Sequence, residues 1–169
     1  KKYINKVYNS LKLIKSKYVM LFDNDDFPIM YGINKCLSKL ESSRDIIGCG
    51  GYIINYNLFN LKNKKNFLSG NIVNLSKINL GNNFNNPNVL KRLETFLCKK
   101  KNINTVNDIF KTDILRDNYK ILKNLKFKYV FFYYLIGDVL NYSRGKVFKI
   151  KLPLIVHQHH PNALSLKMK

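Results

Sequence analysis

The stretch that decides the fold is an apolar run that ends in an acidic turn: Lys17-Tyr18-Val19-Met20-Leu21-Phe22-Asp23-Asn24-Asp25-Asp26. Five apolar residues in succession have the length of a strand. Continuous runs of this kind are typical of strands buried on both faces of a parallel sheet that helices cover. Three carboxylates follow within four residues. We therefore expect a buried strand over 17–23 that delivers carboxylates to its carboxyl end.

The segments on either side of this run predict alternating helices and strands. Apolar residues at helical spacing predict one helix over 3–16 and another from Ile33 to about Ser42. Residues 46–54 are apolar enough for the next strand, although three glycines loosen it. This helix-strand-helix-strand order indicates an α/β fold with helices flanking the sheet.

The middle of the chain is less regular. Residues 55–86 are rich in Asn, Lys and Gly, and we expect an irregular insertion there, with at most a short hairpin. Residues 87–97 carry leucines on one helical face. Residues 105–118 fit either a strand followed by a helix or a single helix, and the sequence leaves both open.

The last third predicts a helix followed by two strands. Residues 129–142 place Phe131, Leu135 and Tyr142 on one stripe, with Gly145 as a stop signal. Short strands are expected over 146–150 and 154–157, separated by Pro153. With 169 residues, the chain suits a single domain, 1–169.

The net charge of +20 comes almost entirely from lysine, since only four of the 30 basic residues are Arg. A basic domain suits nucleic acid, an anionic membrane or a polyphosphate substrate. Nucleic-acid sites favour the arginine fork, and the lysines are scattered, so no nucleic-acid partner is expected. Lys, Asn, Ile, Phe and Tyr all have AT-rich codons, which accounts for much of the charge. The surface would still help a peripheral protein to sit on anionic lipid.

Cysteine content and hydropathy predict the compartment. Cys36, Cys49 and Cys98 show neither paired nor metal-type spacing, so we expect free thiols in a reducing compartment. The longest apolar run, residues 130–137, is far shorter than the roughly 20 residues that span a bilayer. The expected location is cytoplasmic, with a peripheral position at the inner face of the membrane.

The acidic turn has a specific chemical requirement. Carboxylates brought together repel one another unless a positive group compensates them, and a divalent cation is the simplest such group. Mg²⁺ and Mn²⁺ take oxygen ligands and commonly bridge carboxylates to phosphate oxygens. Open α/β sheets bind ligands at the carboxyl ends of their strands. The alternative is a solvated turn that simply ends the strand.

Three segments carry a resemblance to a known family. Residues 16–27 resemble the central motif of GT-A glycosyltransferases, family 2-like, in which a strand runs into Asp-x-Asp-Asp. Residues 45–52 look like the strand that follows in that family, and residues 145–165 are similar to the tail of a bacterial subgroup. The resemblance implies a GT-A sheet flanked by helices, a divalent metal (Mn²⁺ or Mg²⁺), and transfer of a sugar from a nucleotide-sugar donor to a glycan or lipid-linked acceptor, as in cell-surface polysaccharide biosynthesis.

The resemblance also implies roles for individual residues. Asp23 would contact the ribose of the nucleotide or belong to the metal site, and Asp25 would ligate the metal on the diphosphate. Asp26, next to it, would support either role. Among the histidines, His157 follows the last predicted strand, where some GT-A enzymes place a metal ligand. Two alternatives lie just beyond it: His159 and His160.

The chain departs from the family pattern in two places. Inverting members need a carboxylate base, usually from a Glu-Asp pair, and the corresponding residues 128–132 contain no acid. Asp138, on the apolar side of the predicted 129–142 helix, is the candidate base. Asp108 and Asp113 are alternatives, and a helix cap or surface charge is the ordinary interpretation of each.

The second departure is at the start. The family opens with a strand and a Pro-Thr-Tyr-Asn-like loop, whereas this chain opens on the predicted helix, so we expect an N-terminally truncated, partial domain. Three rival functions follow from the same features. They are a catalytically impaired GT-A-fold binding or scaffold protein, a metal-dependent nucleotidyltransferase, and, on charge alone, a nucleic-acid-binding module.

Overall fold

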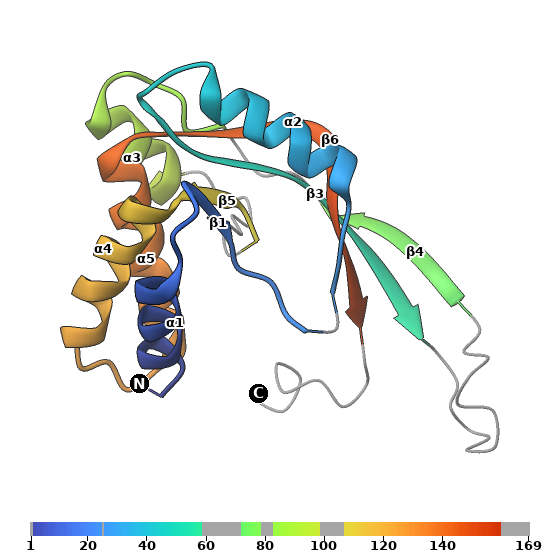
Figure 1. Ribbon diagram of the computed structural model, residues 1–169, viewed down its shortest axis with the longest axis horizontal. Coiled ribbons are helices and arrows are strands. Elements are labelled where there is room, and N and C mark those ends of the chain that lie inside the picture. The colour runs from blue at the N-terminus through green and yellow to red at the C-terminus, as the bar shows by residue number, and fades with distance from the viewer. Residues whose placement is uncertain (1, 25, 59–71, 79–82, 99–106, 160–169) are drawn as a thin grey trace.

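The computed structural model describes residues 2–24, 26–58, 72–78, 83–98 and 107–159. These residues form an α/β fold, as the sequence predicts (Figure 1). Along the chain the elements are α1 (Lys2–Leu13), β1 (Tyr18–Met20), β2 (Phe27–Pro28), α2 (Met30–Glu41), β3 (Ile46–Leu58), β4 (Ile72–Ile78), α3 (Val89–Cys98), β5 (Ile109–Lys111), α4 (Thr112–Asn124), α5 (Val130–Arg144) and β6 (Lys146–His159).

The sheet is mixed, which corrects the expectation of a parallel one. Its strand order is β1-β5-β3-β6-β2, and β4 pairs with β3 off this path. The long β3 and β6 run parallel to each other, while every other pair among the described strands is antiparallel. The two long strands therefore form the spine on which the shorter ones are placed.

The first strand is shorter and less buried than its apolar run predicts. β1 pairs antiparallel with β5 and stands at one end of the strand order, and its three side chains are only half-buried. Because β5 has only three residues, the ladder ends at Met20. Leu21 and Phe22 continue as a loop, in which Phe22 is 47% exposed. The prediction of a doubly buried strand over 17–23 is therefore wrong.

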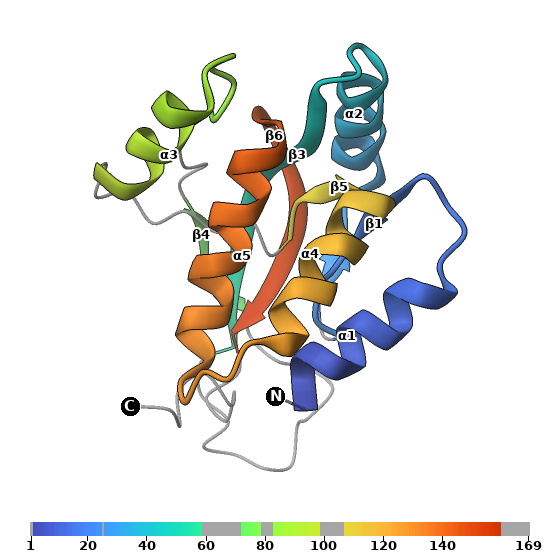
Figure 2. The same cartoon turned by 90° about the vertical axis from the view of Figure 1, so that its left-hand side faces the viewer.

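Side-chain alternation gives the sheet two apolar faces. Ile47, Phe110 and Val147 point to one face and pack with α1, α3, α4 and α5. Ile46 and Ile109, their sequence neighbours, point to the other face and pack under α2. Figures 1 and 2 show the resulting three layers, with α2 alone on its side of the sheet.

The last strand is continuous, although two strands separated by Pro153 are predicted. β6 pairs with β3 from Ile46 to Asn57, and its register shifts on either side of Tyr52, which faces Pro153. A register shift leaves room for a residue that cannot donate to the ladder, so proline does not break the strand. The expectation of two short strands is thus wrong.

The predicted helices are present, with one correction. The helices expected over 3–16, 33–42 and 87–97 are α1, α2 and α3, and 105–118 is a strand followed by a helix. α5 ends at Arg144, before Gly145. However, the predicted stripe is buried only in part: Tyr142 is buried, with Tyr133 as a second buried ring, whereas Phe131 is 66% exposed.

Within the expected insertion, the described residues are partly ordered as strand. β3 continues through Leu58, and β4 pairs antiparallel with it, in keeping with the expected hairpin. The loop between the two strands lies outside the described residues. The cysteines are free thiols, as predicted: Cys36 of α2 and Cys49 of β3 are buried between that helix and the sheet, and Cys98 is exposed.

Candidate functional site

The pairing of β2 with β6 brings the acidic turn to His157. Phe27 lies opposite Val156, and Pro28 lies opposite Ile155, in an antiparallel register. Continuing this register by one residue sets Asp26 opposite His157. Two residues 131 positions apart in the sequence are therefore neighbours because of a two-residue strand.

Asp26 is buried against the imidazole. Its side chain is 1% exposed, and Oδ1 lies 2.6 Å from His157 Nδ1. A carboxylate oxygen accepts, so we assign the proton in this contact to Nδ1 of His157. A neutral imidazole with its proton there carries its lone pair on Nε2. Asp26 Oδ2 is buried and has no hydrogen-bond partner among the described residues. Carboxylate–imidazole pairs of this kind commonly orient metal-ligating histidines.

The turn itself is held by the backbone. The amide of Asp26 donates to the carbonyl of Asp23 at 3.2 Å, which closes the chain over the two residues between them. Asp25 lies in this turn but outside the described residues, so its predicted role as a metal ligand stays a prediction. His160 and the side chain of His159 also lie outside the described residues.

Asn55 joins the pair from β3, and sequence reasoning missed it. It is the register partner of His157 across the parallel β3–β6 ladder, so both side chains lie on the same face. Its Oδ1 is buried without a partner among the described residues. The predicted strand ended at residue 54, so Asn55 fell into the expected insertion; only the register with β6 identifies it.

Asp23 lies on the other side of the turn, toward the helices. It is exposed. Partial burial is the main cause of the raised pKa values of Tyr3 in α1 and Tyr134 in α5, and the negative charge of Asp23 raises both further. Tyr3 and Tyr134 pack edge to face with ring centroids 6.5 Å apart. The acidic turn thus presents Asp26 to the sheet and Asp23 to a pair of tyrosines.

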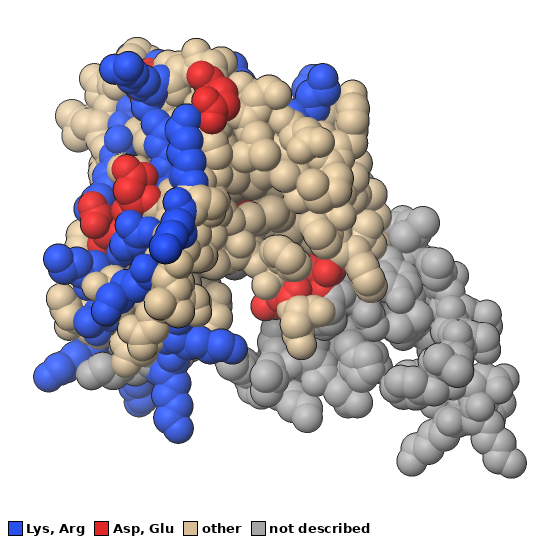
Figure 3. Space-filling model, in the orientation of Figure 1, with Lys and Arg blue, Asp and Glu red and all other residues tan. Residues whose placement is uncertain are grey.

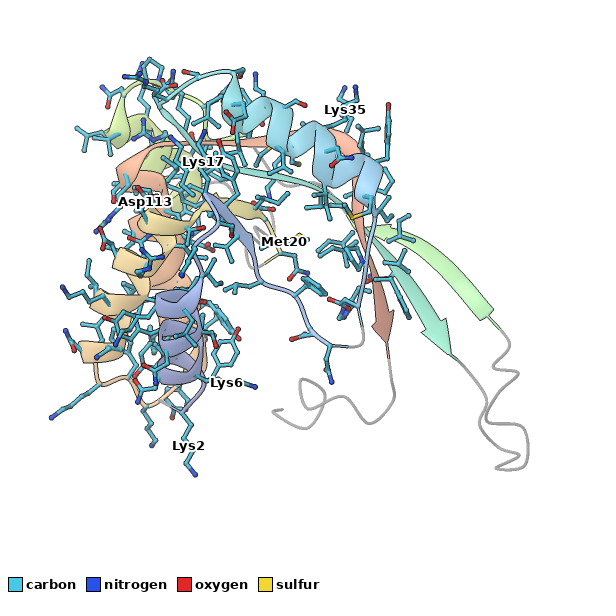
Figure 4. The ribbon with its side chains drawn as sticks, viewed as in Figure 1. Lys2, Lys6, Lys17, Met20, Lys35 and Asp113 are labelled. Carbon is cyan, nitrogen blue, oxygen red and sulfur yellow. The ribbon has the colours of Figure 1, made fainter. Side chains whose placement is uncertain are left out.

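A cleft lies beside Asp23, between α1 and residues 20–24. Its volume is about 490 Å³, and its lining includes Lys6, Ser10 and Asp23. Figure 4 shows Met20 on the sheet and Lys6 on α1. A cation, a hydroxyl and a carboxylate in an open cleft of this size suit a phosphate-bearing ligand.

Asp138, the predicted base, lies in a different cavity. This cavity holds about 40 Å³ and is lined by α1, α4 and α5 side chains that include Tyr119, Tyr134 and Asn141. Burial raises the pKa of Tyr119, and the charges of its neighbours, Asp138 among them, raise it further. Asp23 and Asp138 therefore lie near one cluster of tyrosines, Tyr3, Tyr119 and Tyr134.

The alternative bases have structural roles. Asp108 is completely buried and accepts two hydrogen bonds from Lys149 Nζ, at 2.6 and 2.5 Å; burial raises the pKa of its carboxyl despite that cation. Neither a helix cap nor a surface charge describes this ion pair, so that interpretation is wrong for Asp108. Asp113 is an exposed carboxylate in the first turn of α4, as the ordinary interpretation holds.

Three findings on the chain as a whole bear on the site. Within the ranges that the structure describes, no group of three or more His, Cys, Asp or Glu side chains is close enough together to hold a metal ion. Across the same ranges, no helix has the length and apolar character that crossing a membrane requires. The chain matches no protein-family model and no curated protein.

Proposed function

We propose that the chain transfers a sugar from a nucleotide-sugar donor to a glycan or lipid-linked acceptor, in a GT-A-like domain of the family 2 type. The observation that carries this proposal is the contact between Asp26 and His157. An acidic turn after a strand is common in proteins, but here it is joined to a histidine from the last strand of the same sheet. The mixed α/β sheet flanked by helices is compatible with this domain type.

Among the described residues, the Asp26–His157 pair is the part that fits a divalent cation, and Asp25 would add a further ligand. Asp26 buries a carboxylate oxygen that has no partner among the described residues, and its other oxygen holds the His157 ring through Nδ1. In that tautomer Nε2 carries the lone pair, which is the form that ligates metals. His157 and Asp25 would be the ligands, with Asp23, on the other side of the turn, acting through a metal-bound water, and carboxylate ligands suit Mn²⁺ or Mg²⁺.

Each residue then has a distinct task. When bound, the cation would supply electrostatic stabilisation of the departing nucleoside diphosphate. Asp26 acts as a positioning residue that holds the imidazole in one tautomer and one orientation. Lys6 and Ser10, in the cleft beside Asp23, would contact phosphate oxygens. In this proposal the donor binds at the acidic turn and in the cleft between α1 and residues 20–24.

The proposal assigns Asp138 to deprotonation of the acceptor hydroxyl. It and Asp23 lie near the same tyrosine cluster, which connects the base to the donor side of the turn. A carboxylate serves as a base when it is ionised and within one water of the hydroxyl. The cavity of about 40 Å³ beside Asp138 has room for one such water.

The test is release of nucleoside diphosphate. The chain is incubated with Mn²⁺ and, in turn, with UDP-, GDP- and dTDP-sugars, with and without glycan acceptors, and the released diphosphate is measured. With a donor that the chain uses, Asp26→Asn should lower turnover at least tenfold, because loss of a group that orients a metal-ligating histidine typically costs about 10–100-fold. Asp138→Asn should lower acceptor-dependent release more than donor binding.

Asp113→Asn is the matched control, because it removes a carboxylate from the exposed first turn of α4. It should retain wild-type turnover. Equal turnover in Asp26→Asn and Asp113→Asn would contradict the proposal. Saturable donor binding without any release would instead identify a binding protein.

A further inference from the structure

Three helix ends meet at one end of the helical layer. α1 begins there at Lys2, α4 ends there at Asn124, and α5 begins there after residues 125–129 (Figures 1 and 2). We call this surface the helix-end tip and define it by Lys2, Lys126, Lys128, Tyr129, Phe131 and Phe132. It is separate from the Asp26–His157 pair, which lies on the sheet.

The tip exposes aromatic rings that the core does not use. Tyr129 is 58% exposed, Phe131 66% and Phe132 42%. The Phe131 and Phe132 rings contact each other with centroids 5.9 Å apart, and Phe132 also packs on Phe127 at 5.7 Å. Phe131 and Phe132 therefore form one apolar cluster with Phe127, and Tyr129 lies next to it in the chain. Clusters of exposed apolar groups commonly mark interaction sites.

The two sequence segments that build the tip carry charge of a single sign. Neither residues 1–22 nor residues 118–137 contain an Asp or Glu, and together they contain ten lysines. Lys128 lies over the Tyr129 ring at 5.4 Å. Lys2 and Lys6 extend from the same end of α1 (Figure 4). Basic side chains predominate on the helical layer, with a few acidic ones among them, and the acidic turn lies apart from it (Figure 3).

We infer that the helix-end tip docks on the surface of an anionic lipid bilayer. Phenylalanine rings at the end of helices can enter the interfacial region, while the lysines around them pair with anionic headgroups. Tyrosine suits the boundary between the two. Phenylalanine offers no hydrogen bond to a base edge, and the tip contains no Arg, which disfavours nucleic acid as the occupant. Docking of this kind is independent of sugar transfer.

Vesicle sedimentation tests the inference on the full chain. Wild-type protein should sediment with vesicles of phosphatidylcholine and phosphatidylserine at 7:3, but not with phosphatidylcholine alone, and 0.5 M NaCl should weaken binding. Lys126→Glu/Lys128→Glu should lower the partition coefficient about twentyfold, roughly fivefold for each lysine. Phe131→Ser/Phe132→Ser should lower it about tenfold or more, because two rings no longer enter the interface.

The matched control reverses two lysines elsewhere. Lys35→Glu/Lys39→Glu makes the same charge change on α2, on the other side of the sheet, and should change binding less than threefold. An equal loss in both charge variants would overturn the inference, since net charge alone would then explain binding. Wild-type binding by the Phe131→Ser/Phe132→Ser variant would also overturn it.

Two further outcomes distinguish other occupants. Sedimentation equilibrium without vesicles should give the same mass for wild type and Phe131→Ser/Phe132→Ser. A dimer that the variant dissociates would identify the tip as a contact between copies and refute lipid docking. Circular dichroism should show the same helix content in all variants, because every changed side chain is exposed apart from the half-buried Lys39 of the control. Tighter binding to single-stranded DNA than to the anionic vesicles would likewise refute it.

Discussion

Tyr119 illustrates how a single buried residue in the helical layer responds to its neighbours. It is 8% exposed, shares a hydrogen bond with Tyr3, and lies near Tyr134 and Asp138. Burial is the main cause of its raised pKa, and the surrounding negative groups add to it. The folded chain therefore favours the neutral phenol more strongly than the unfolded chain does.

This raised pKa predicts a loss of stability at alkaline pH. The contribution of Tyr119 to the free energy of unfolding is fully present below the pKa of about 10 that tyrosine has in the unfolded chain. It falls as the pH rises from there toward the pKa of Tyr119 in the folded chain. Between pH 10 and 11 Tyr119 alone should remove about 1 kcal/mol from the free energy of unfolding. Urea unfolding followed by circular dichroism should show a smaller drop over this interval in Tyr119→Phe than in wild type.

Tyr129→Phe is the control for this titration, because Tyr129 is 58% exposed. It should lose stability with pH as wild type does. If Tyr119→Phe lost stability as steeply as wild type, the titrating group would lie elsewhere.

At the scale of elements, α2 rests on β6 through a glycine. A Cβ on Gly32 would lie 2.0 Å from the backbone oxygen of Pro153, so no larger side chain fits without moving the helix. By contrast, a Cβ on Gly137 in α5 would meet only Leu122 Cδ1, at 3.5 Å, which is an ordinary contact. A larger side chain is therefore tolerated at Gly137 but not at Gly32.

This difference predicts opposite effects of one substitution. Gly32→Ala should lower the free energy of unfolding by about 1–2 kcal/mol, since overpacking outweighs the better helix propensity of alanine. Gly137→Ala should raise it by up to about 1 kcal/mol. Chemical denaturation of both variants measures these changes. Destabilisation of equal size in both would contradict the close approach of α2 to β6.

The elements also show where the sequence was informative. Helical spacing depends on neighbours along the chain, so α1, α2, α3 and α5 could be predicted from local pattern. The place of β1 in the sheet depends on which strand pairs with it. Its partner β5 lies some ninety residues away and has only three residues, which no local pattern shows. The break predicted at Pro153 is wrong for a similar reason: the proline is accommodated by a register shift between β6 and its neighbour β3, which the local sequence does not show.

The candidate site follows the same rule. Asp26 and His157 were each identifiable, one from a cluster of carboxylates and one from its place after a predicted strand. Their contact depends on the register of β2 on β6, and Asn55 enters through the register of β3. The buried pairing of Asp108 with Lys149 was likewise hidden, because it joins residues 41 positions apart.

At the scale of the whole molecule, the described residues form two different surfaces. The sheet carries the Asp26–His157 pair, and the helical layer carries lysines and exposed aromatic rings. We propose that the first binds a cation and a nucleoside diphosphate and that the second faces a membrane. An enzyme that uses a soluble donor and a lipid-linked acceptor would need both surfaces at once.

Isothermal titration calorimetry of MnCl₂ into the chain, in the presence of UDP or GDP, tests the central claim most directly. Wild type should give a saturable heat with at least one diphosphate, and Asp117→Asn, which removes an exposed carboxylate from α4, should match it. His157→Ala and Asp26→Asn should weaken Mn²⁺ binding about tenfold or more, as loss of a ligand and of its orienting carboxylate requires. Heats for His157→Ala and Asp26→Asn that equal those of wild type would contradict a metal-diphosphate site at the acidic turn.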